Sequence, residues 1–323
     1  MCFGFRGDRL LKVRRFVLGM DEADWLKVRN AVFAVRVDTA SLSIEEMRII
    51  EKSPDFDSEG RFIAELDSQP VGIVHAHIDR LLEEKKGFVR GLAVVPEFRG
   101  EGIEEKLAET ALEELKNRGM KVVQSLVDSD QEDLVRLWEG LGFKLVRRFS
   151  LMTRDLVGLQ SDIGENMEVV LKLLRKDADE DLEALNRLEN ECFKEGFNWR
   201  HEPLKATVYR VREDPTFRIQ DWFFAVLNGK QVGFIGTGID ESYNEEKNAK
   251  IGWVLDIGVL EPYRRTGIGT RLMLHGMNLL KAKGMTFAML GVDDLNVTKT
   301  MKLYEKVGFN VVKKDLTYEK GIE

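Results

Sequence analysis

Residues 256–271 read D-I-G-V-L-E-P-Y-R-R-T-G-I-G-T-R and combine positive charge with two glycines one residue apart. The β-forming residues before Pro262 predict a strand, and the apolar spacing after Gly269 predicts a helix. At a turn from strand to helix, glycines let a ligand approach the backbone, and the first N–H groups of the helix have no partner within it. Such a turn can bind phosphate or another anion.

The order of charge and glycines separates this turn from two common phosphate-binding loops. A P-loop places a lysine and a hydroxyl residue directly after its last glycine, and a dinucleotide-binding loop carries glycines as G-x-G-x-x-G. The turn here has the pattern Arg264-x-x-Gly267-x-Gly269. It fits neither loop, and these six residues alone also fit an ordinary strand-to-helix turn.

The pattern resembles the R/Q-x-x-G-x-G/A motif with which GNAT-superfamily N-acetyltransferases bind the pyrophosphate of an acyl-CoA. The resemblance implies that the turn binds acetyl-CoA as a co-substrate. It also implies that the strand before the turn binds the pantetheine arm and the thioester through backbone groups. The residues implied are Ile257, Gly258, Val259, Arg264, Arg265, Thr266, Gly267, Ile268, Gly269 and Thr270.

A second stretch, N-V-T-K-T-M-K-L-Y-E-K-V-G-F from Asn296 to Phe309, resembles the family signature N-x-x-A-x-x-L-Y-x-x-x-G-F. By this resemblance Asn296 contacts the CoA arm, and Tyr304 is the general acid that protonates the leaving thiolate. The alternative for Tyr304 is a helix tyrosine that packs on the sheet with its hydroxyl in water.

The sequence leaves open which group removes the proton of the amine. Many family members use a glutamate at the strand position that Trp253 occupies here, so that base is absent. Asp256 is the strongest remaining candidate, although strand alternation predicts that it faces away from Trp253. Asp240, Glu241 and a chain of water molecules are alternatives, and His275 is expected to be a helix-face residue.

The elements that must position these residues occur twice in the chain. Val71-Gly72 recurs as Val232-Gly233, and Gly142-Phe143 recurs as Gly308-Phe309, in the same order around the glycine turn. In the first copy, strands are predicted at 10–18, 61–66, 71–78, 87–95, 121–127 and 143–153, and helices at 21–33, 43–51, 103–117 and 132–141. In the second copy, strands are predicted at 169–174, 222–227, 231–239, 254–259, 286–292 and 309–318, and helices at 179–193, 270–283 and 297–307.

This order of hairpins followed by a β-α-β-α-β tail predicts an α+β (mixed α/β) fold. It resembles two tandem GNAT folds, each with a splayed mixed sheet flanked by helices. We expect a first domain at 1–155 and a second, acetyl-CoA-binding domain at 166–323. The polar segment 155–166, which carries two glycines, is the expected linker.

The first copy departs from the motifs at three positions. Glu104 stands in place of the second glycine, Asp130 in place of the asparagine, and Trp138 in place of the tyrosine. A carboxylate beside the pyrophosphate would repel it, and an indole cannot act as a general acid in this role. We therefore expect the first domain to keep the fold and to lose acyl-CoA binding.

The acceptor is expected to be a primary amine, on a small molecule or a peptide, that attacks the thioester directly. Residues expected near it are Glu195, Phe197, Trp199, Arg200, His201 and Tyr243, which fit a cationic amine and equally fit packing between domains. Two other functions remain open. One is a non-enzymatic acyl-CoA-binding regulator or sensor, and the other is an aminoacyl-transferring relative.

Composition restricts the remaining possibilities for this chain of 323 residues. Its formal net charge of −7 argues against non-specific binding to nucleic acid, and no apolar run approaches the about 20 residues of a membrane span. The two cysteines predict no disulfide framework and favour the cytoplasm. His75 and His77 lie two residues apart on one face of a strand, but the sequence indicates no third ligand and no metal site is expected. The sequence leaves the oligomeric state open.

Overall fold

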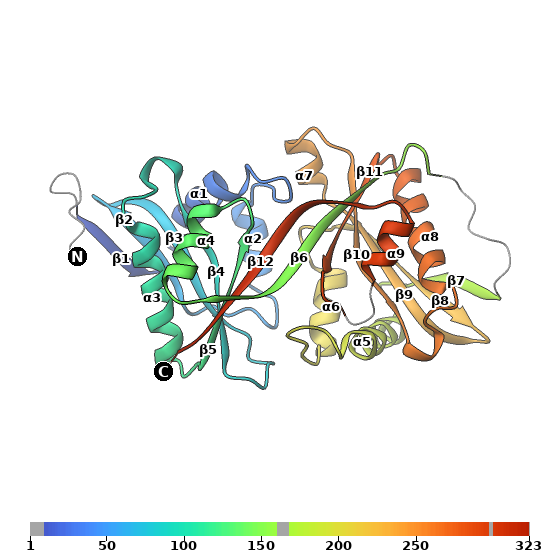
Figure 1. Ribbon diagram of the computed structural model, residues 1–323. Coiled ribbons are helices and arrows are strands. Elements are labelled where there is room, and N and C mark those ends of the chain that lie inside the picture. The colour runs from blue at the N-terminus through green and yellow to red at the C-terminus, as the bar shows by residue number, and fades with distance from the viewer. Residues whose placement is uncertain (1–9, 160–167, 297–299, 323) are drawn as a thin grey trace. The chain divides into compact units, whose positions relative to one another are not determined.

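The protein divides into two compact units in the computed structural model (Figure 1). The residues that the structure describes are 10–159, 168–296 and 300–322. Unit 1 comprises Met1–Arg147 and Asp315–Glu323, and unit 2 comprises Arg148–Lys314. Most of the expected linker, from residue 160 onward, lies outside the described residues. Each unit is considered by itself below.

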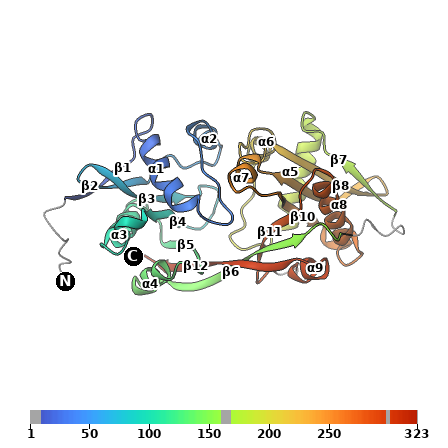
Figure 2. The ribbon, with the colours of Figure 1, turned by 90° about the horizontal axis from the view of Figure 1, so that it is seen from above.

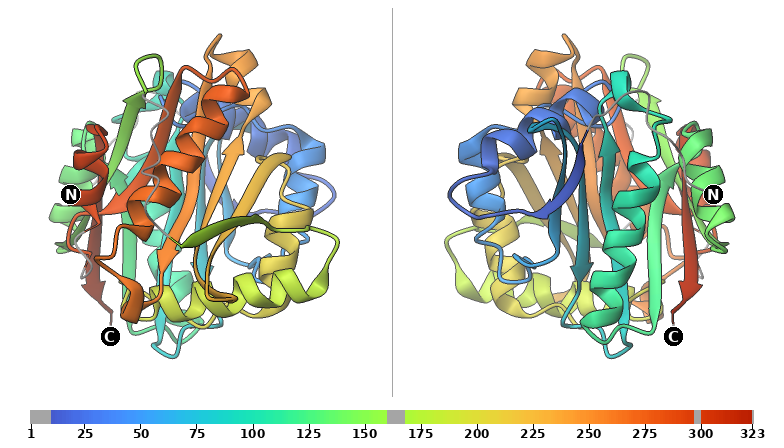
Figure 3. Two further views of the ribbon diagram at one scale, coloured as in Figure 1. Left: turned by 90° about the vertical axis from the view of Figure 1, so that its right-hand side faces the viewer. Right: turned by 90° about the vertical axis from the view of Figure 1, so that its left-hand side faces the viewer.

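Unit 1 is a mixed sheet with helices on both faces. Its strands are β1 (Leu11–Arg15), β2 (Arg61–Leu66), β3 (Gln69–Ile78), β4 (Lys86–Val94), β5 (Val122–Asp128) and the last part of β12 (Asn310–Gly321). Its helices are α1 (Glu22–Phe33), α2 (Ile44–Ile50), η1 (Pro96–Phe98), α3 (Ile103–Asn117) and α4 (Glu132–Gly140). The strands from β1 to β4 are antiparallel, and β5 is parallel to β4. Figure 3 shows α3 in teal and α1 in blue beside this sheet.

Unit 2 repeats this order. Its strands are β7 (Val169–Leu173), β8 (Ile219–Leu227), β9 (Lys230–Ile239), β10 (Ile251–Val259), β11 (Phe287–Asp293) and the last part of β6 (Lys144–Asp155). Its helices are α5 (Asp179–Phe193), α6 (Leu204–Arg212), α7 (Glu241–Glu246), η2 (Glu261–Tyr263), α8 (Ile268–Ala282) and α9 (Met301–Lys306). The mixed fold and the repeat are confirmed. The prediction missed α6 and α7, and the start of the helix predicted at 297–307 lies partly outside the described residues.

The last strand of each sequence copy completes the sheet of the other unit. Residues 149–155 of β6 pair antiparallel with β11 in unit 2, and residues 315–321 of β12 pair antiparallel with β5 in unit 1. The chain therefore passes from unit 1 to unit 2 within β6 and returns within β12. Because of this exchange, unit 1 consists of two separate segments of the chain, and the boundary between the units does not lie at a single point after Asp155.

Each sheet opens at a parallel pair of strands. In unit 2, β10 pairs with β11 only from Ile251 to Trp253, so in the described structure residues 254–259 of β10 have no partner strand on that side. In unit 1, β4 pairs with β5 from Lys86 to Val89. This is the expected splay, and it leaves backbone N–H and C=O groups along one edge of β10 available to a ligand.

Helices cover both faces of the unit 2 sheet (Figure 2). On one face, Gly252 lets Leu280 of α8 approach, because a Cβ there would lie 2.5 Å from the Leu280 side chain. On the other face, a Cβ at Gly258 would lie 3.0 Å from Cys192 of α5. Each face therefore has its own apolar core, one beneath α8 and α9 and one beneath α5 and α6.

Deleting residues 315–323 is expected to destabilise unit 1. The deleted strand contributes the buried Tyr318, whose hydroxyl donates a hydrogen bond to Glu139 at 3.0 Å. Loss of one buried aromatic side chain costs about 3–5 kcal/mol, and the edge pairing of β5 is lost as well. Thermal unfolding followed by circular dichroism should show a new transition at lower temperature, while unit 2 retains its transition. A single unchanged transition would contradict the strand exchange.

Candidate active site

Arg264 fixes the turn that follows β10. Its Nε donates a hydrogen bond to the carbonyl oxygen of Val259 at 3.0 Å, and its Nη2 donates to the carbonyl oxygen of Cys192 at 3.4 Å. In unit 1, Arg99 donates to the carbonyl oxygen of Val94 at 3.1 Å in the same way. The motif arginine thus ties the turn to its strand in both units, which explains why a unit can keep this residue and still lose other parts of the motif.

The glycines of the turn have different roles. Gly267 has φ of 92°, a left-handed conformation that glycine adopts readily, and α8 begins directly after it. Gly269 is not in that region, and a Cβ there would lie 3.4 Å from Leu303 and 3.9 Å from Val259, which are ordinary contacts. The fold therefore tolerates a Cβ at Gly269, and the glycine leaves space at the start of α8.

The residues around this space fit the pyrophosphate of acetyl-CoA. The N–H groups of Ile268, Gly269 and Thr270 are in the first turn of α8, where no intrahelical acceptor exists. The positive end of the helix dipole favours an anion at the same place. Thr266 is held by a hydrogen bond from its hydroxyl to the carbonyl oxygen of Tyr263 at 2.7 Å. The turn brings together the predicted residues from Arg264 to Thr270.

The corresponding turn of unit 1 contains a carboxylate of its own. Gly102, with φ of 81°, precedes α3, and Glu104 stands in the first turn of that helix. Burial raises the pKa of Glu104, while the N–H groups of Glu104 and Gly100 act in the opposite direction. These amides can affect the carboxyl only if it lies close to them. Glu104 therefore places a carboxyl group at the start of α3, where an anionic ligand would approach.

Trp138 in unit 1 takes the structural place of Tyr304 in unit 2. Trp138 is fully buried and its ring lies 4.8 Å from that of Phe143, whereas the ring of Tyr304 lies 6.2 Å from that of Phe309. Both pairs connect the last helix of a copy to the Gly-Phe that follows it. The fold accepts either aromatic side chain here, so the hydroxyl of Tyr304 is not required for packing.

Tyr304 is a buried phenol of α9, in the apolar core on the α8 side of the sheet. Its side chain is 6% exposed, and burial raises its pKa to about 12. A hydrogen bond with Thr300 acts in the opposite direction, and the charge of Asp256 adds to the rise. The phenol is therefore protonated throughout the physiological range. The effect of Asp256 shows that the two predicted catalytic side chains lie within electrostatic reach of each other.

A β-bulge changes the face on which Asp256 lies. Trp253 is paired with Gly238 and Asp256 with Gly236, so the register shifts by one residue at Leu255. Residues directly opposite each other share a face, and Gly236 and Gly238 are two positions apart on β9. The expectation that Asp256 faces away from Trp253 is therefore wrong. Both side chains lie on the face covered by α5 and α6.

Asp256 is accessible and poorly hydrated at the same time. Its side chain keeps 36% of its surface accessible, yet burial among protein atoms raises its pKa. Arg210 acts in the opposite direction, and Glu202 adds to the rise. A ligand can therefore reach this carboxylate, whose charged form is less well solvated than in water.

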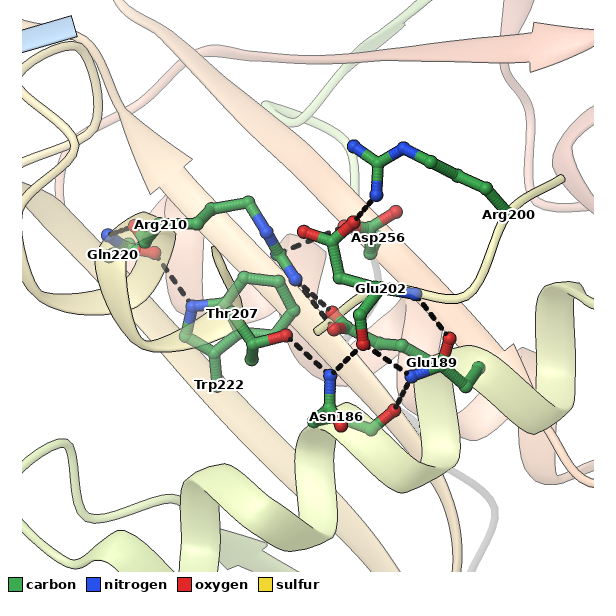
Figure 4. Close-up of polar contacts among 10 residues, drawn as sticks. Asn186, Glu189, Arg200, Glu202, Thr207, Arg210, Gln220, Trp222 and Asp256 are labelled. Carbon is green, nitrogen blue, oxygen red and sulfur yellow. Dashed lines mark hydrogen bonds and ion pairs between the residues drawn. The ribbon is translucent and has the colours of Figure 1, made fainter. Parts of the chain in front are cut away.

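Arg210 of α6 lies between Asp256 and Glu189 of α5 (Figure 4). Its Nη2 donates to both carboxylate oxygens of Glu189, at 2.7 and 2.6 Å, and its Nη1 lies 3.4 Å from Oδ2 of Asp256. The guanidinium carbon also lies 5.1 Å from the centre of the Trp222 ring. Glu189 and Arg210 were absent from the predicted site.

Glu202 enters the same site from the segment before α6. Its backbone N–H donates to Oδ1 of Asn190 at 2.7 Å, and its carbonyl oxygen accepts from Nδ2 of Asn186 at 2.8 Å and of Asn190 at 3.0 Å. Its carboxylate forms an ion pair with Arg200. The asparagines of α5 thus hold this segment, and through it Glu202, in place (Figure 4).

One signal in the sequence pointed to these missed residues. Leu204, Val208 and Val211 have the spacing of a helix face, and Pro203 precedes them as it often does at a helix start. A helix predicted there would have placed Arg210 in the last turn of α6. Glu189 lay in a predicted helix, but its ion pair with Arg210 becomes visible only once α6 is placed.

Three other residues were considered as the base: Asp240, Glu241 and His275. Oδ1 of Asp240 accepts from the N–H of Tyr243 at 2.8 Å and caps α7, where Glu241 is exposed. His275 lies on α8, and its ring lies 4.3 Å from that of Phe223. It is therefore on the α8 side of the sheet, whereas Asp256 is on the α5 side.

The residues predicted to line the acceptor site do not form one uniform group. Glu195 lies 3.8 Å from Arg264, and the ring of Phe197 lies 6.3 Å from that of Phe149. Trp199 and His201 are exposed, Arg200 pairs with Glu202, and Tyr243 is buried. Asn296 follows β11, with its N–H donating to the carbonyl oxygen of Asp293 at 3.1 Å.

In unit 1 the structure supplies a third possible ligand for the two histidines. Asp57, His75 and His77 place ligand atoms within 4.8 Å of one another, so the fold brings in a candidate ligand that the sequence did not indicate. Both oxygens of Asp57 accept hydrogen bonds from Arg118 at 3.0 Å, and Oδ2 also accepts from the N–H of Ile78 at 2.8 Å. Asp57 is thus already engaged by a cation.

No helix in the described parts of the chain has both the length and the apolar character to cross a membrane.

The sequence matches a protein-family model described as the acetyltransferase (GNAT) family at residues 30–143 and 182–309. Similar proteins include a mycothiol acetyltransferase of Thermobispora bispora, 31% identical over 71% of this chain and 75% of that protein. Another, from Streptomyces coelicolor, is 34% identical over 41% of this chain. The match spans only 42% of the Streptomyces protein, and similarly 43% and 44% of relatives from Thermomonospora curvata and Thermobifida fusca.

Solved structures show the same fold over almost the whole chain. A tandem GNAT protein from the clavulanic acid biosynthesis pathway aligns with a TM-score of 0.74 and 14% identity, covering 97% of this chain and 98% of that one. A GCN5-related N-acetyltransferase from Sphaerobacter thermophilus aligns with a TM-score of 0.72 and 19% identity, covering 96% and 95%. Two copies in tandem are thus a known architecture for this fold.

Proposed function

Because the chain belongs to the acetyltransferase (GNAT) family, we propose that it transfers an acetyl group from acetyl-CoA to a primary amine, with the active site in unit 2. The observation that carries this proposal is the open edge of β10. It runs from Asp256 to the turn at Arg264, and the charge of Asp256 acts on the phenol of Tyr304. An extended ligand along this edge reaches both the anion site and the two titratable side chains.

The residues of the open edge would hold the co-substrate. The N–H groups at the start of α8 would bind the pyrophosphate, and Gly269 would leave room for it. Along residues 257–259, backbone groups that point away from β9 would pair with the pantetheine arm, and one N–H would polarise the thioester carbonyl. Asn296 would contact the arm from the segment after β11. Acetyl-CoA would supply the acyl group, and no covalent enzyme intermediate is needed.

Asp256 would accept the first proton in the reaction. The acceptor arrives as R–NH₃⁺, and loss of one proton to Asp256 frees the nitrogen lone pair to attack the carbonyl carbon. The C–S bond then breaks, the nitrogen loses its second proton, and the sulfur gains one. One proton is released overall, from Asp256 to solvent. The raised pKa of Asp256 suits this task, because a stronger base removes a proton more readily.

Tyr304 would act on the leaving sulfur. A thiol has a pKa of about 8.5, so complete transfer from a phenol with a pKa of about 12 to the thiolate is uphill. The hydroxyl would therefore stabilise the developing negative charge by a hydrogen bond, and would release its proton to sulfur as the nitrogen proton replaces it. This role requires a protonated phenol at every working pH, and the pKa of Tyr304 meets that requirement.

Unit 1 would keep the fold without binding acetyl-CoA. Glu104 fills its turn with a negative charge, and Trp138 replaces the phenol. The first domain, predicted at 1–155, would thus be the degenerate copy, and the second, at 166–323, the active one. The mycothiol acetyltransferase relatives favour a small-molecule amine over a peptide as the acceptor. We place the reaction in the cytoplasm, because the chain carries only two cysteines.

Tyr304→Phe is expected to lower kcat about 10²-fold or more, because a positioned proton donor contributes 10²- to 10⁴-fold. The assay measures thiol release from acetyl-CoA with a panel of small primary amines. Binding of acetyl-CoA should be unchanged, since the ring still packs against Phe309. Tyr318→Phe, which removes a buried hydroxyl in unit 1, is the matched control. No turnover of any amine by the wild-type protein, with acetyl-CoA bound, would favour the sensor over the enzyme.

A further inference from the structure

Arg210 serves two carboxylates unequally. It makes two short hydrogen bonds to Glu189, at 2.7 and 2.6 Å, and one long contact to Asp256, at 3.4 Å. Its position is fixed by the Trp222 ring beneath it and by α6 itself, whose carbonyl at Arg210 accepts from Gln220 at 3.0 Å. Figure 4 shows the guanidinium between the carboxylates of Glu189 and Asp256. Arg210 therefore forms its stronger ion pair with Glu189 and only a weak one with Asp256.

Unit 1 shows that the fold does not need this arrangement of two carboxylates around an arginine at this place. The side-chain amide of Asn30 in α1 donates a hydrogen bond to the carbonyl oxygen of Leu42 and accepts one from its N–H, both at 2.9 Å. The side chain of Asn190 in α5 makes the same two bonds with the backbone of Glu202. This shared clamp aligns the two units at this place. With Asn190 aligned to Asn30, the positions of Glu189, Glu202 and Arg210 are occupied in unit 1 by Arg29, Leu42 and Ile50. With the glycine turns aligned, the position of Asp256 is occupied by Gly91.

Burial in unit 2 penalises the charged forms of Glu189 and Asp256. Burial raises the pKa of Glu189 to about 7 and also raises that of Asp256, and the two carboxyls interact through the same arginine. The protons of such a pair belong to the pair as a whole. Since unit 1 folds without two carboxylates around an arginine at this place, this arrangement in unit 2 calls for a functional reason.

We propose that Glu189 is a positioning residue for the transfer reaction: by holding Arg210, it keeps that guanidinium from neutralising Asp256, which stays free to accept the proton of the amine. The inference rests on the proposed function, because it assigns Asp256 to the reaction. It adds Glu189 and Arg210, neither of which needs to touch the substrate.

The charged groups facing Asp256 make the direction of the effect clear. Arg210 of α6 contacts Asp256 on one side and Glu189 of α5 on the other. Glu202, in the segment before α6, and Tyr304 of α9 interact with Asp256 through their charge or dipole. Without the charge of Glu189, the guanidinium is left uncompensated 3.4 Å from Asp256. It would then pair with Asp256, stabilise the ionised carboxylate and make it a weaker base.

Glu189→Gln and Glu189→Asp form the central comparison. Glutamine keeps the size of the side chain and loses the charge, whereas aspartate keeps the charge and loses one methylene. A merely structural role would be preserved better by glutamine. The proposed role would be preserved better by aspartate. Glu114→Gln, which removes an arginine-paired buried carboxylate in unit 1, is the control for a change of charge elsewhere.

The first measurement is a ¹³C NMR titration of the Asp256 carboxyl carbon, assigned with Asp256→Asn. We expect Glu189→Gln to lower its midpoint by about 1–3 pH units, the usual effect of an opposite charge within 4–6 Å. Glu189→Asp should restore most of that change, and Glu114→Gln should cause none. An unchanged midpoint in Glu189→Gln would overturn the proposal. This titration needs no acceptor, so it tests the positioning even if the proposed function fails.

The second measurement is the pH dependence of kcat/KM with an amine that the wild-type enzyme acetylates. We expect the acidic limb of Glu189→Gln to move to lower pH by the same amount as the NMR midpoint, with a lower plateau and an unchanged Kd for acetyl-CoA. Glu189→Asp should move both back. If the NMR midpoint moves and the rate profile does not, Asp256 is not the base, and the role of Glu189 in the reaction is overturned with it.

Discussion

A calorimetric titration of acetyl-CoA into the Gly269→Glu protein is expected to show no binding, whereas the wild-type protein binds one molecule per chain. The substitution copies the state of unit 1, where Glu104 stands at the start of α3. Two unit charges 4 Å apart near a protein surface repel by about 4 kcal/mol, which is about a thousandfold in Kd. The Cβ itself causes no clash, so the folded structure should persist.

Two further variants sharpen this test. Gly269→Ala adds only the Cβ, which the fold accommodates at 3.4 Å from Leu303, so any loss of binding measures the space that the ligand needs. Glu104→Gly removes the carboxylate from unit 1 and should leave the wild-type affinity of unit 2 unchanged. Two binding sites in the wild-type chain, or undiminished binding by Gly269→Glu, would show that unit 1 is not the silent copy.

Asp256→Asn is expected to lower kcat/KM by about 10²- to 10⁴-fold, the usual contribution of a positioned general base. In the wild-type enzyme the rate should rise with pH as Asp256 ionises, and because its pKa is raised the rise should lie above the range of an ordinary aspartate. The variant should lack this rise. Stopped assays of amide formation across the pH range, at saturating acetyl-CoA, measure both effects.

The acceptor itself provides a control for the loss of the base. Above the pKa of the amine the nucleophile is already neutral and needs no base, so the deficit of Asp256→Asn should shrink there. Affinity for acetyl-CoA should stay at the wild-type value, because the turn at Arg264 is unaffected. A variant with the same pH profile as the wild type would exclude Asp256 and would favour the chain of water molecules.

The parts of the site that the sequence predicted well are local ones. The turn from Arg264 to Thr270 depends on residues within six positions of each other, and Gly267 adopts the left-handed conformation that such a turn uses. Most helices and strands were predicted for the same reason, since periodicity is a property of neighbouring residues. The helices α3 and α5 and the strand β2 begin and end at the predicted residues.

The parts that were missed depend on pairing between distant segments. The bulge at Leu255 is a matter of register between β9 and β10, and alternation counted along one strand cannot reveal it. Arg210 lies 21 residues from Glu189 and 46 from Asp256 along the chain, so their contact exists only once α6 packs on the sheet. The same holds for Asp57, which reaches His75 and His77 through the fold.

The strand exchange has a consequence for how the protein is made. A ribosome releases the chain from its first residue onward, and domains usually fold in that order. Unit 1, however, receives residues 315–321 only after all of unit 2 has been translated, so the edge of β5 stays uncovered until then. An uncovered edge can pair with other chains until it is closed. The half of the protein that is made first is therefore completed last.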